Sequence, residues 1–276
     1  MAFVKISEQP SLYNDLEKKS VHDILTEINQ EDHKVADAVQ AAIPAIERLV
    51  EGIVPRMQEG GRIFYMGAGT SGRLGVLDAS EIPPTFGMSQ GWIIGLIAGG
   101  DYALRNAVEN AEDDTEQGWK DLLEYDINPL DTVIGIAASG TTPYVIGALR
   151  DARAHGCLTA AITSNPDAPV SQVAEIPIEM IVGPEYVTGS SRMKSGTGQK
   201  LICNMISTSV MIKMGRVKGN KMVNMQLTNA KLVDRGTRML IDDLGLSYDE
   251  ANEMLLKYGS VKKAEDAYRE QKTEKQ

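Results

Sequence analysis

The stretch Arg62–Pro84, RIFYMGAGTSGRLGVLDASEIPP, decides how the chain folds. It begins with a short apolar run and continues into the pattern G-x-G-x-x-G, formed by Gly67, Gly69 and Gly72. An apolar run that ends at closely spaced glycines and then opens a helix predicts a buried strand, a tight turn and a helix N-terminus that can bind an anion. The same pattern is typical of dinucleotide-binding turns, so the first question is which phosphate-bearing ligand the turn holds.

Four more apolar runs along the chain have the length of buried strands. They cover residues 92–100, 131–140, 158–165 and 176–183. Apolar strands that alternate with helical segments predict a parallel sheet with right-handed crossovers and helices on both faces. The expected fold class is therefore α/β, a five-stranded parallel sheet in an αβα sandwich.

Helical segments flank the expected sheet at both ends of the chain. Apolar residues recur at helical spacing through residues 11–60, where Pro44 is expected to begin a new helix or to kink the existing one. We also expect a helix from Ala103 to Tyr125 and helices from Val217 onward. The predicted organisation is an N-terminal helical segment, a central sheet domain and a C-terminal helical segment, at 1–45, 46–216 and 217–276.

The composition narrows the class of protein. The chain has 276 residues, 42% of them hydrophobic, and a formal net charge of −10. This charge argues against nucleic acid and anionic membranes as partners. The two cysteines, Cys157 and Cys203, lack a metal-ligand spacing. Because we see neither a signal peptide nor a membrane-length apolar run, we expect a cytoplasmic protein.

Three turns rich in hydroxyl groups follow expected strands. They are GAGTSGR at 67–73, ASGTTP at 138–143 and VTGSSRMKSGT at 187–197. Each leads into a helix, so free backbone N–H groups and the positive end of the helix dipole point at the turn. One such turn would be ordinary helix capping. Three of them at the carboxyl edge of one sheet indicate a site for a phosphate or a polyol.

The context favours a sugar phosphate over a dinucleotide. Asp101 follows the second strand, where an acid could bind a ribose hydroxyl, but it lies about thirty residues after the glycine turn rather than the usual twenty or so. A dinucleotide fold also has no need of the second and third hydroxyl-rich turns. We therefore expect a small sugar phosphate as the ligand.

Four long blocks of the sequence resemble one known family. The blocks GAGTSGRLGVLDASEIPPTFG, GLIAGGDYALRNAVENAEDD, GIAASGTTPYV and VTGSSRMKSGTGQKL occur in the same order as in the N-acetylmuramic acid 6-phosphate etherases, a branch of the sugar-isomerase (SIS) fold. The resemblance covers roughly residues 15–240. It implies cleavage of the D-lactyl ether of N-acetylmuramic acid 6-phosphate to N-acetylglucosamine 6-phosphate and D-lactate, a step in cell-wall sugar recycling. It also implies a homodimer.

Cleavage of such an ether suits a pair of proton-transfer groups. The C1 aldehyde of the open-chain sugar acidifies the C2 proton; a base removes it, an acid protonates the lactyl oxygen that leaves C3, and water adds to the resulting double bond. This route needs no metal and no redox cofactor. The three histidines, His22, His33 and His155, are not at expected strand ends, so carboxylates are the natural candidates.

Two carboxylates match the blocks of the family. Glu81 lies in DASEIPP, where we expect Pro83 and Pro84 to hold a stiff turn after the helix, and the resemblance implies that it is the acid for lactate departure. Glu112 would continue an apolar stripe with Leu104 and Val108 on the expected helix, which should raise its pKa. The resemblance implies that Glu112 is the base at C2; the two roles could be exchanged.

The hydroxyl-rich turns supply the expected binding residues. By resemblance to other SIS proteins, the second turn should hold the phosphate. We expect Thr70 and Ser71 of the first turn to assist and Arg192 and Lys194 of the third to neutralise charge. The residues that we expect to bind substrate are Gly69, Thr70, Ser71, Gly72, Ser139, Gly140, Thr141, Thr142, Ser190, Ser191, Arg192 and Lys194. Arg73 is a further candidate, although Arg73 and Lys194 could equally be surface residues.

Other functions remain open from the sequence. A sugar-phosphate isomerase would use the same turns and one carboxylate, without a second to expel an alcohol. A sugar-phosphate sensor, similar to glucokinase regulatory protein, would bind without turnover and would not require both Glu81 and Glu112. A dinucleotide-dependent oxidoreductase would show binding of its cofactor. Release of D-lactate distinguishes the etherase from all three.

Overall fold

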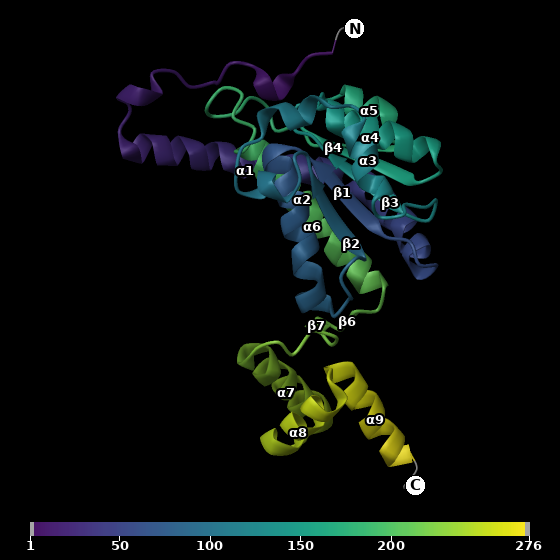
Figure 1. Cartoon of the computed structure of the whole chain (residues 1–276). Helices are drawn as coiled ribbons and strands as arrows, with labels where there is room; N and C mark the ends of the chain where they lie inside the picture. The colour runs from purple at the N-terminus through teal and green to yellow at the C-terminus, as the bar shows by residue number, and fades with distance from the viewer. Residues whose placement is uncertain (1–2, 274–276) are drawn as a thin grey trace. The chain divides into compact units, whose positions relative to one another are not determined.

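The structure is a computed structural model that describes residues 3–273. The chain forms two compact units. The sheet unit comprises the chain up to Ser80 and Gly91–Thr208, and the C-terminal unit comprises Glu81–Gln90 and the chain from Ser209 onward. Figure 1 shows the elements of both units.

The sheet unit contains the predicted parallel sheet. Its strands are β1 (Ile63–Gly67), β2 (Ile93–Ile97), β3 (Thr132–Ile136), β4 (Leu158–Thr163) and β5 (Ile176–Glu179). They lie in the order β2-β1-β3-β4-β5, and all neighbouring pairs are parallel. The strand order reverses at β1, whose neighbours β2 and β3 both follow it in the chain. Ligands in open parallel sheets bind at the carboxyl end of such a reversal, which here is the glycine turn after β1.

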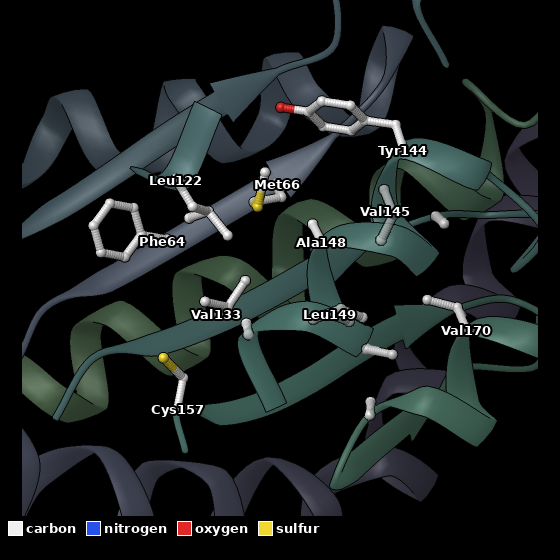
Figure 2. Close-up of a cluster of buried hydrophobic side chains, with 14 of the residues drawn as sticks. Phe64, Met66, Leu122, Val133, Tyr144, Val145, Ala148, Leu149, Cys157 and Val170 are labelled. Atoms are coloured by element: carbon white, nitrogen blue, oxygen red, sulfur yellow. The ribbon is translucent and has the colours of Figure 1, made fainter. Parts of the chain in front are cut away.

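Helices cover both faces of the sheet, as the sequence predicts. Side chains alternate along β1, so Phe64 and Met66 pack with residues of α3 (Gln117–Leu123), α4 (Pro143–Ala154) and α5 (Pro169–Val173) in one buried cluster, which Figure 2 shows. Tyr65 points to the opposite face, where its hydroxyl donates to the Cys203 carbonyl of α6 (Lys194–Lys213). On that face α2 (Gly69–Phe86) and α1 (Val21–Gln58) also pack against the strands.

The helix expected over Ala103–Tyr125 is wrong. The structure has two short 3-10 helices, η3 (Asp101–Leu104) and η4 (Glu109–Asp113), before α3 begins. Arg73 donates to the carbonyls of Ala103 and Leu104, which are the acceptors that a continuing helix would need. The Asp114 side chain accepts from two backbone N–H groups of the following turn. The Arg73 and Asp114 side chains thus bind backbone groups that would otherwise form the hydrogen bonds of a continuous helix.

Three other boundaries also differ from the prediction. Pro44 lies inside the continuous helix α1, so of the two expected outcomes the start of a new helix is wrong; Pro44 is exposed, as is Gln40, whose carbonyl loses its helical partner. Pro83 and Pro84 lie inside α2, which continues to Phe86 instead of ending before them. The chain after Val217 first forms a two-stranded hairpin, β6 (Val217–Lys218) with β7 (Lys221–Met222), before it becomes helical.

The C-terminal unit has its own small core. Its helices are α7 (Ala230–Leu244), α8 (Tyr248–Tyr258) and α9 (Val261–Thr273). They enclose a buried cluster that includes Met225, Leu240 and Leu255. Ser247 and Glu250 form a reciprocal capping box at the start of α8. Across residues 3–273 no helix is long and apolar enough to cross a membrane.

Candidate active site

The carboxyl ends of β1 and β3 bring the first two hydroxyl-rich turns together. After β1 the chain turns at Gly69, whose φ of 53° is in the left-handed region, and α2 begins there. After β3 the chain turns at Gly140, and α4 begins at Pro143 with Thr142 as its N-cap. The Thr142 side chain makes no capping hydrogen bond within the described chain, so its hydroxyl is available to a ligand.

A cavity of about 470 Å³ opens between these turns, and we call it the hydroxyl cavity. It contains seven of the predicted binding residues and one of the two predicted catalytic carboxylates, Glu112. Its lining residues are Lys5, Glu8, Ala68, Gly69, Thr70, Ser71, Glu112, Asp113, Ala138, Ser139, Thr141, Thr142, Pro143 and Ser191. Lys5 and Glu8 are functional candidates that the sequence reasoning missed, because no motif links the N-terminal residues to the strand ends.

Glu112 lies at the junction of two cavities. Besides the hydroxyl cavity it lines a neighbouring one of about 420 Å³, together with Gly69, Arg73 and Val108. The side chain is open to this space, yet the surrounding protein partly desolvates it, and this effect and then the charge of Asp113 raise the pKa of Glu112. A carboxylate with a raised pKa is a stronger base than an ordinary one, which suits proton abstraction next to a carbonyl.

Arg73 fixes the segment that carries Glu112. Its Nε donates to the Leu104 carbonyl at 3.0 Å, and its Nη2 donates to the carbonyls of Ala103 at 2.8 Å and Asn106 at 3.4 Å. The guanidinium therefore ties the start of α2 to the loop that leads to η4. This contact explains how Glu112 reaches the cavity without the helix that the sequence predicts.

The second turn is held rigidly by its own hydrogen bonds and by Asn165. The Ser139 and Thr141 hydroxyls are 3.0 Å apart, and the Thr141 N–H donates to Ser139 Oγ at 3.2 Å. Asn165 is buried and donates to the carbonyls of Ala138 and Ser139. Gly140 has a φ of 74°, and a Cβ there would lie 2.3 Å from the Ala168 Cβ. The turn can therefore present hydroxyl and N–H groups with little reorganisation.

The other predicted binding residues occupy different environments. Gly72 is packed against Ile97, where a Cβ would lie 2.6 Å away. Ser191 lines the hydroxyl cavity, whereas Gly140, Ser190 and Arg192 do not belong to its wall, and Arg192 is exposed. Ser71 lines the cavity and its hydroxyl also donates to Gln199 Oε1 at 3.0 Å, which links α2 to α6.

Lys194 is buried in an ion pair instead of lining the hydroxyl cavity. Its Nζ donates to Glu31 Oε2 at 2.6 Å, and both side chains are 2% exposed. Burial acts to raise the pKa of Glu31, but hydrogen bonds from Lys194, Lys34 and Tyr13 outweigh it and lower that pKa. The Glu185 carboxylate accepts from the backbone N–H groups of Lys194 and Ser195 at 2.9 Å each. These contacts fix the part of the third turn where α6 begins.

Glu81 belongs to the C-terminal unit. It is exposed on α2 and lines a separate cavity of about 220 Å³ with Pro84, Lys231, Leu232 and Arg235 among others. Two cations on the wall of this cavity could bind an anionic group near the Glu81 carboxylate. The two predicted catalytic carboxylates thus lie in different compact units.

Comparison with known proteins identifies the family. Residues 45–153 match the glucokinase regulatory protein N-terminal SIS domain, and residues 114–209 match the SIS domain. The structure of a phosphoheptose isomerase from Francisella tularensis superposes with a TM-score of 0.54. The match covers 70% of this chain and 99% of the other chain at 18% sequence identity, and it supports the fold.

Two relatives extend over nearly the whole chain. A Bacteroides fragilis protein named N-acetylmuramic acid 6-phosphate etherase is 75% identical over 97% of this chain and 95% of its own length. A Bacteroides thetaiotaomicron protein with the same name is 71% identical over 98% of this chain and 97% of its own length. The resemblance seen in the four sequence blocks is therefore confirmed, and the chain belongs to the N-acetylmuramic acid 6-phosphate etherase family.

Proposed function

We propose that the protein cleaves the D-lactyl ether of N-acetylmuramic acid 6-phosphate, giving N-acetylglucosamine 6-phosphate and D-lactate. The observation that carries the proposal is that Glu112, whose pKa is raised, faces a cavity whose hydroxyl groups come from the carboxyl ends of two neighbouring strands. Family membership points to the substrate, and this geometry supports the proposal that the cavity binds it and that Glu112 acts as the base.

In the proposed reaction the phosphate binds at the second turn. The N-terminus of α4 contributes its dipole, and the hydroxyls of Ser139, Thr141 and Thr142 contribute donors. Gly69, Thr70 and Ser71 at the start of α2 line the same cavity and are proposed to bind the remaining polar groups of the sugar. The N-termini of two helices at one cavity favour a dianion despite the net charge of −10.

Glu112 is the proposed base at C2. It removes the proton that the C1 aldehyde acidifies, and the electron pair forms the C2–C3 double bond as the C3–oxygen bond breaks. Glu81 is the proposed acid that protonates the departing lactyl oxygen, and water then adds at C3 while C2 regains a proton. We propose that these steps proceed without a metal or redox cofactor, in the cytoplasm and in a homodimer.

Release of D-lactate by the purified protein tests the proposal. We expect Glu112→Gln and Glu81→Gln each to lower kcat by at least about a hundredfold, the usual contribution of a general acid or base. Matched controls are Glu116→Gln in the sheet unit and Glu253→Gln in α8, because both carboxylates are exposed and lie outside the cavity walls described above. Equal activity in the catalytic and control variants would contradict the assigned roles.

The match to the glucokinase regulatory protein domain over residues 45–153 favours a second candidate, a sugar-phosphate sensor. Such a protein would bind N-acetylmuramic acid 6-phosphate at the hydroxyl cavity and release no lactate. Calorimetric binding of the sugar phosphate in the absence of turnover would support the sensor over the etherase.

A further inference from the structure

The N-terminal residues form part of the wall of the hydroxyl cavity. Lys5 and Glu8 line it beside the hydroxyl-rich turns, and the 3-10 helix η1 (Ile6–Glu8) follows Lys5 directly. In sequence these residues are about 60 positions from the glycine turn, so only the fold brings them there.

A buried pair of side chains fixes this segment in place. The Ser7 N–H donates to Asn165 Oδ1 at 2.9 Å, and Asn165 Nδ2 donates to Ser7 Oγ at 2.9 Å. Ser7 is 1% exposed and Asn165 is fully buried. Because Asn165 Nδ2 also lies within hydrogen-bond distance of the Ala138 and Ser139 carbonyls, one amide joins the N-terminal segment to the second turn. The segment therefore has a defined position next to the proposed phosphate site.

The charges on the cavity wall single out Lys5. Three carboxylates line the hydroxyl cavity, those of Glu8, Glu112 and Asp113, and within residues 3–273 Lys5 is the one cation on its wall. The Lys5 Nζ lies 3.5 Å from Glu8 Oε1, and both side chains are about 40% exposed. An exposed pair of this kind is weak, so the ammonium can leave Glu8 for a more strongly charged anion.

We propose that Lys5 binds the phosphate of the substrate, and that Ser7 and Asn165 are positioning residues that hold Lys5 beside the second turn. This inference rests on the proposed function for the identity of the ligand and adds a residue that the family motifs do not contain. A dianionic phosphate accepts charge-assisted hydrogen bonds from an ammonium more strongly than the single carboxylate of Glu8 does.

Equilibrium binding of N-acetylglucosamine 6-phosphate, measured by calorimetry at low salt, tests the role of Lys5 without turnover. Lys5→Met keeps most of the stem and removes the charge, so we expect Kd to rise about tenfold, with a weaker dependence on salt. Lys5→Arg should restore affinity to within about threefold, because it retains a cation on the segment. Lys18→Met is the matched control, since Lys18 is exposed in the same N-terminal region and pairs with Asp15.

A double-mutant cycle tests the positioning role of Ser7. We expect Ser7→Ala to weaken binding of the phosphorylated sugar in the wild-type background and to have little further effect in Lys5→Met, because Ser7 acts through Lys5. A merely structural role would give equal effects in both backgrounds and would overturn the assignment of Ser7.

The outcomes for Lys5 separate this inference from the proposed function. If Lys5→Met binds the phosphorylated sugar within twofold of the wild type, the inference is wrong even where D-lactate is released. If Lys5→Met weakens binding tenfold and the wild type releases no D-lactate, Lys5 stands as a phosphate ligand and the etherase proposal fails.

Discussion

The buried pair of Lys194 and Glu31 should respond asymmetrically to mutation. The structure records one charged partner for Lys194 Nζ, the Glu31 carboxylate at 2.6 Å. Glu31 has more hydrogen-bond donors, because its carboxylate also accepts from Lys34 Nζ at 2.6 Å and from the Tyr13 hydroxyl at 3.0 Å. Removal of Glu31 therefore leaves a buried ammonium without its counter-charge, whereas removal of Lys194 leaves a carboxylate that keeps two donors.

The expected magnitudes follow from this difference. Breaking a buried ion pair by removing one partner costs about 3–5 kcal/mol, which we expect for Glu31→Met. For Lys194→Met we expect about 1–3 kcal/mol, the penalty for one lost partner of a buried acceptor. The double variant, with two apolar side chains facing each other, should be more stable than Glu31→Met alone.

Urea unfolding followed by tryptophan fluorescence measures these differences directly. The chain has two tryptophans, Trp92 and Trp119, and both belong to the sheet unit, as Lys194 and Glu31 do. The fluorescence transition therefore reports the unit that contains the pair. Comparison of the four proteins at constant pH and salt gives the free energy of unfolding for each.

Two results would refute this reasoning. One is a free energy of unfolding for Lys194→Met that is lower than that of Glu31→Met, since the carboxylate left in Lys194→Met keeps two donors. The other is a Lys194→Met protein with unchanged stability and lost affinity for the sugar phosphate. That outcome would return Lys194 to the binding role that its place in the third hydroxyl-rich turn predicts.

Three further perturbations test the site. Asp113→Asn removes a negative charge beside Glu112 and should therefore lower the pKa of Glu112. We expect the acidic limb of the pH profile of kcat/KM to move to lower pH. An unchanged limb would contradict Glu112 as the group that titrates. Gly140→Ala should lower the free energy of unfolding by about 1–3 kcal/mol more than Gly183→Ala does. Both glycines have a φ near 70°, but only a Cβ at Gly140 would meet Ala168. Equal losses of stability would contradict this close contact. Glu8→Gln should tighten binding of N-acetylglucosamine 6-phosphate about threefold, because the substitution frees Lys5 and removes a negative charge that repels the phosphate. Glu17→Gln is the control, since Glu17 is exposed. Weaker binding in Glu8→Gln would show that Glu8 itself contacts the sugar.

The sheet was predictable because each strand carries its own local signal. Buried parallel strands are apolar throughout, and β1, β3 and β4 are buried at every position. The glycines and hydroxyls that follow β1 and β3 mark strand ends for a local reason as well, since the chain turns there and the next helix begins. The helix expected over Ala103–Tyr125 was wrong because its outcome depends on Arg73, a residue about thirty positions away, which binds its carbonyls.

Apart from Glu112, the site residues that could be predicted are those that follow a strand. Thr70, Ser71, Ser139, Thr141 and Thr142 line one cavity as the turns suggest. Lys5 and Glu8 reach the same cavity through the Ser7–Asn165 hydrogen bonds, which join residues 158 positions apart and leave no periodic pattern in the sequence. The polar third turn suggested that Lys194 could bind the substrate, but in the structure its ammonium forms a buried ion pair with Glu31 of α1.

Reaction of N-acetylmuramic acid 6-phosphate with the purified protein in D2O tests directly whether the ether is cleaved by elimination at the hydroxyl cavity. We predict stoichiometric D-lactate and N-acetylglucosamine 6-phosphate with deuterium at C2, and loss of both the C2 label and lactate release in Glu112→Gln. Lactate release without a C2 label, or tight binding of the sugar phosphate without any lactate, would contradict elimination at the hydroxyl cavity.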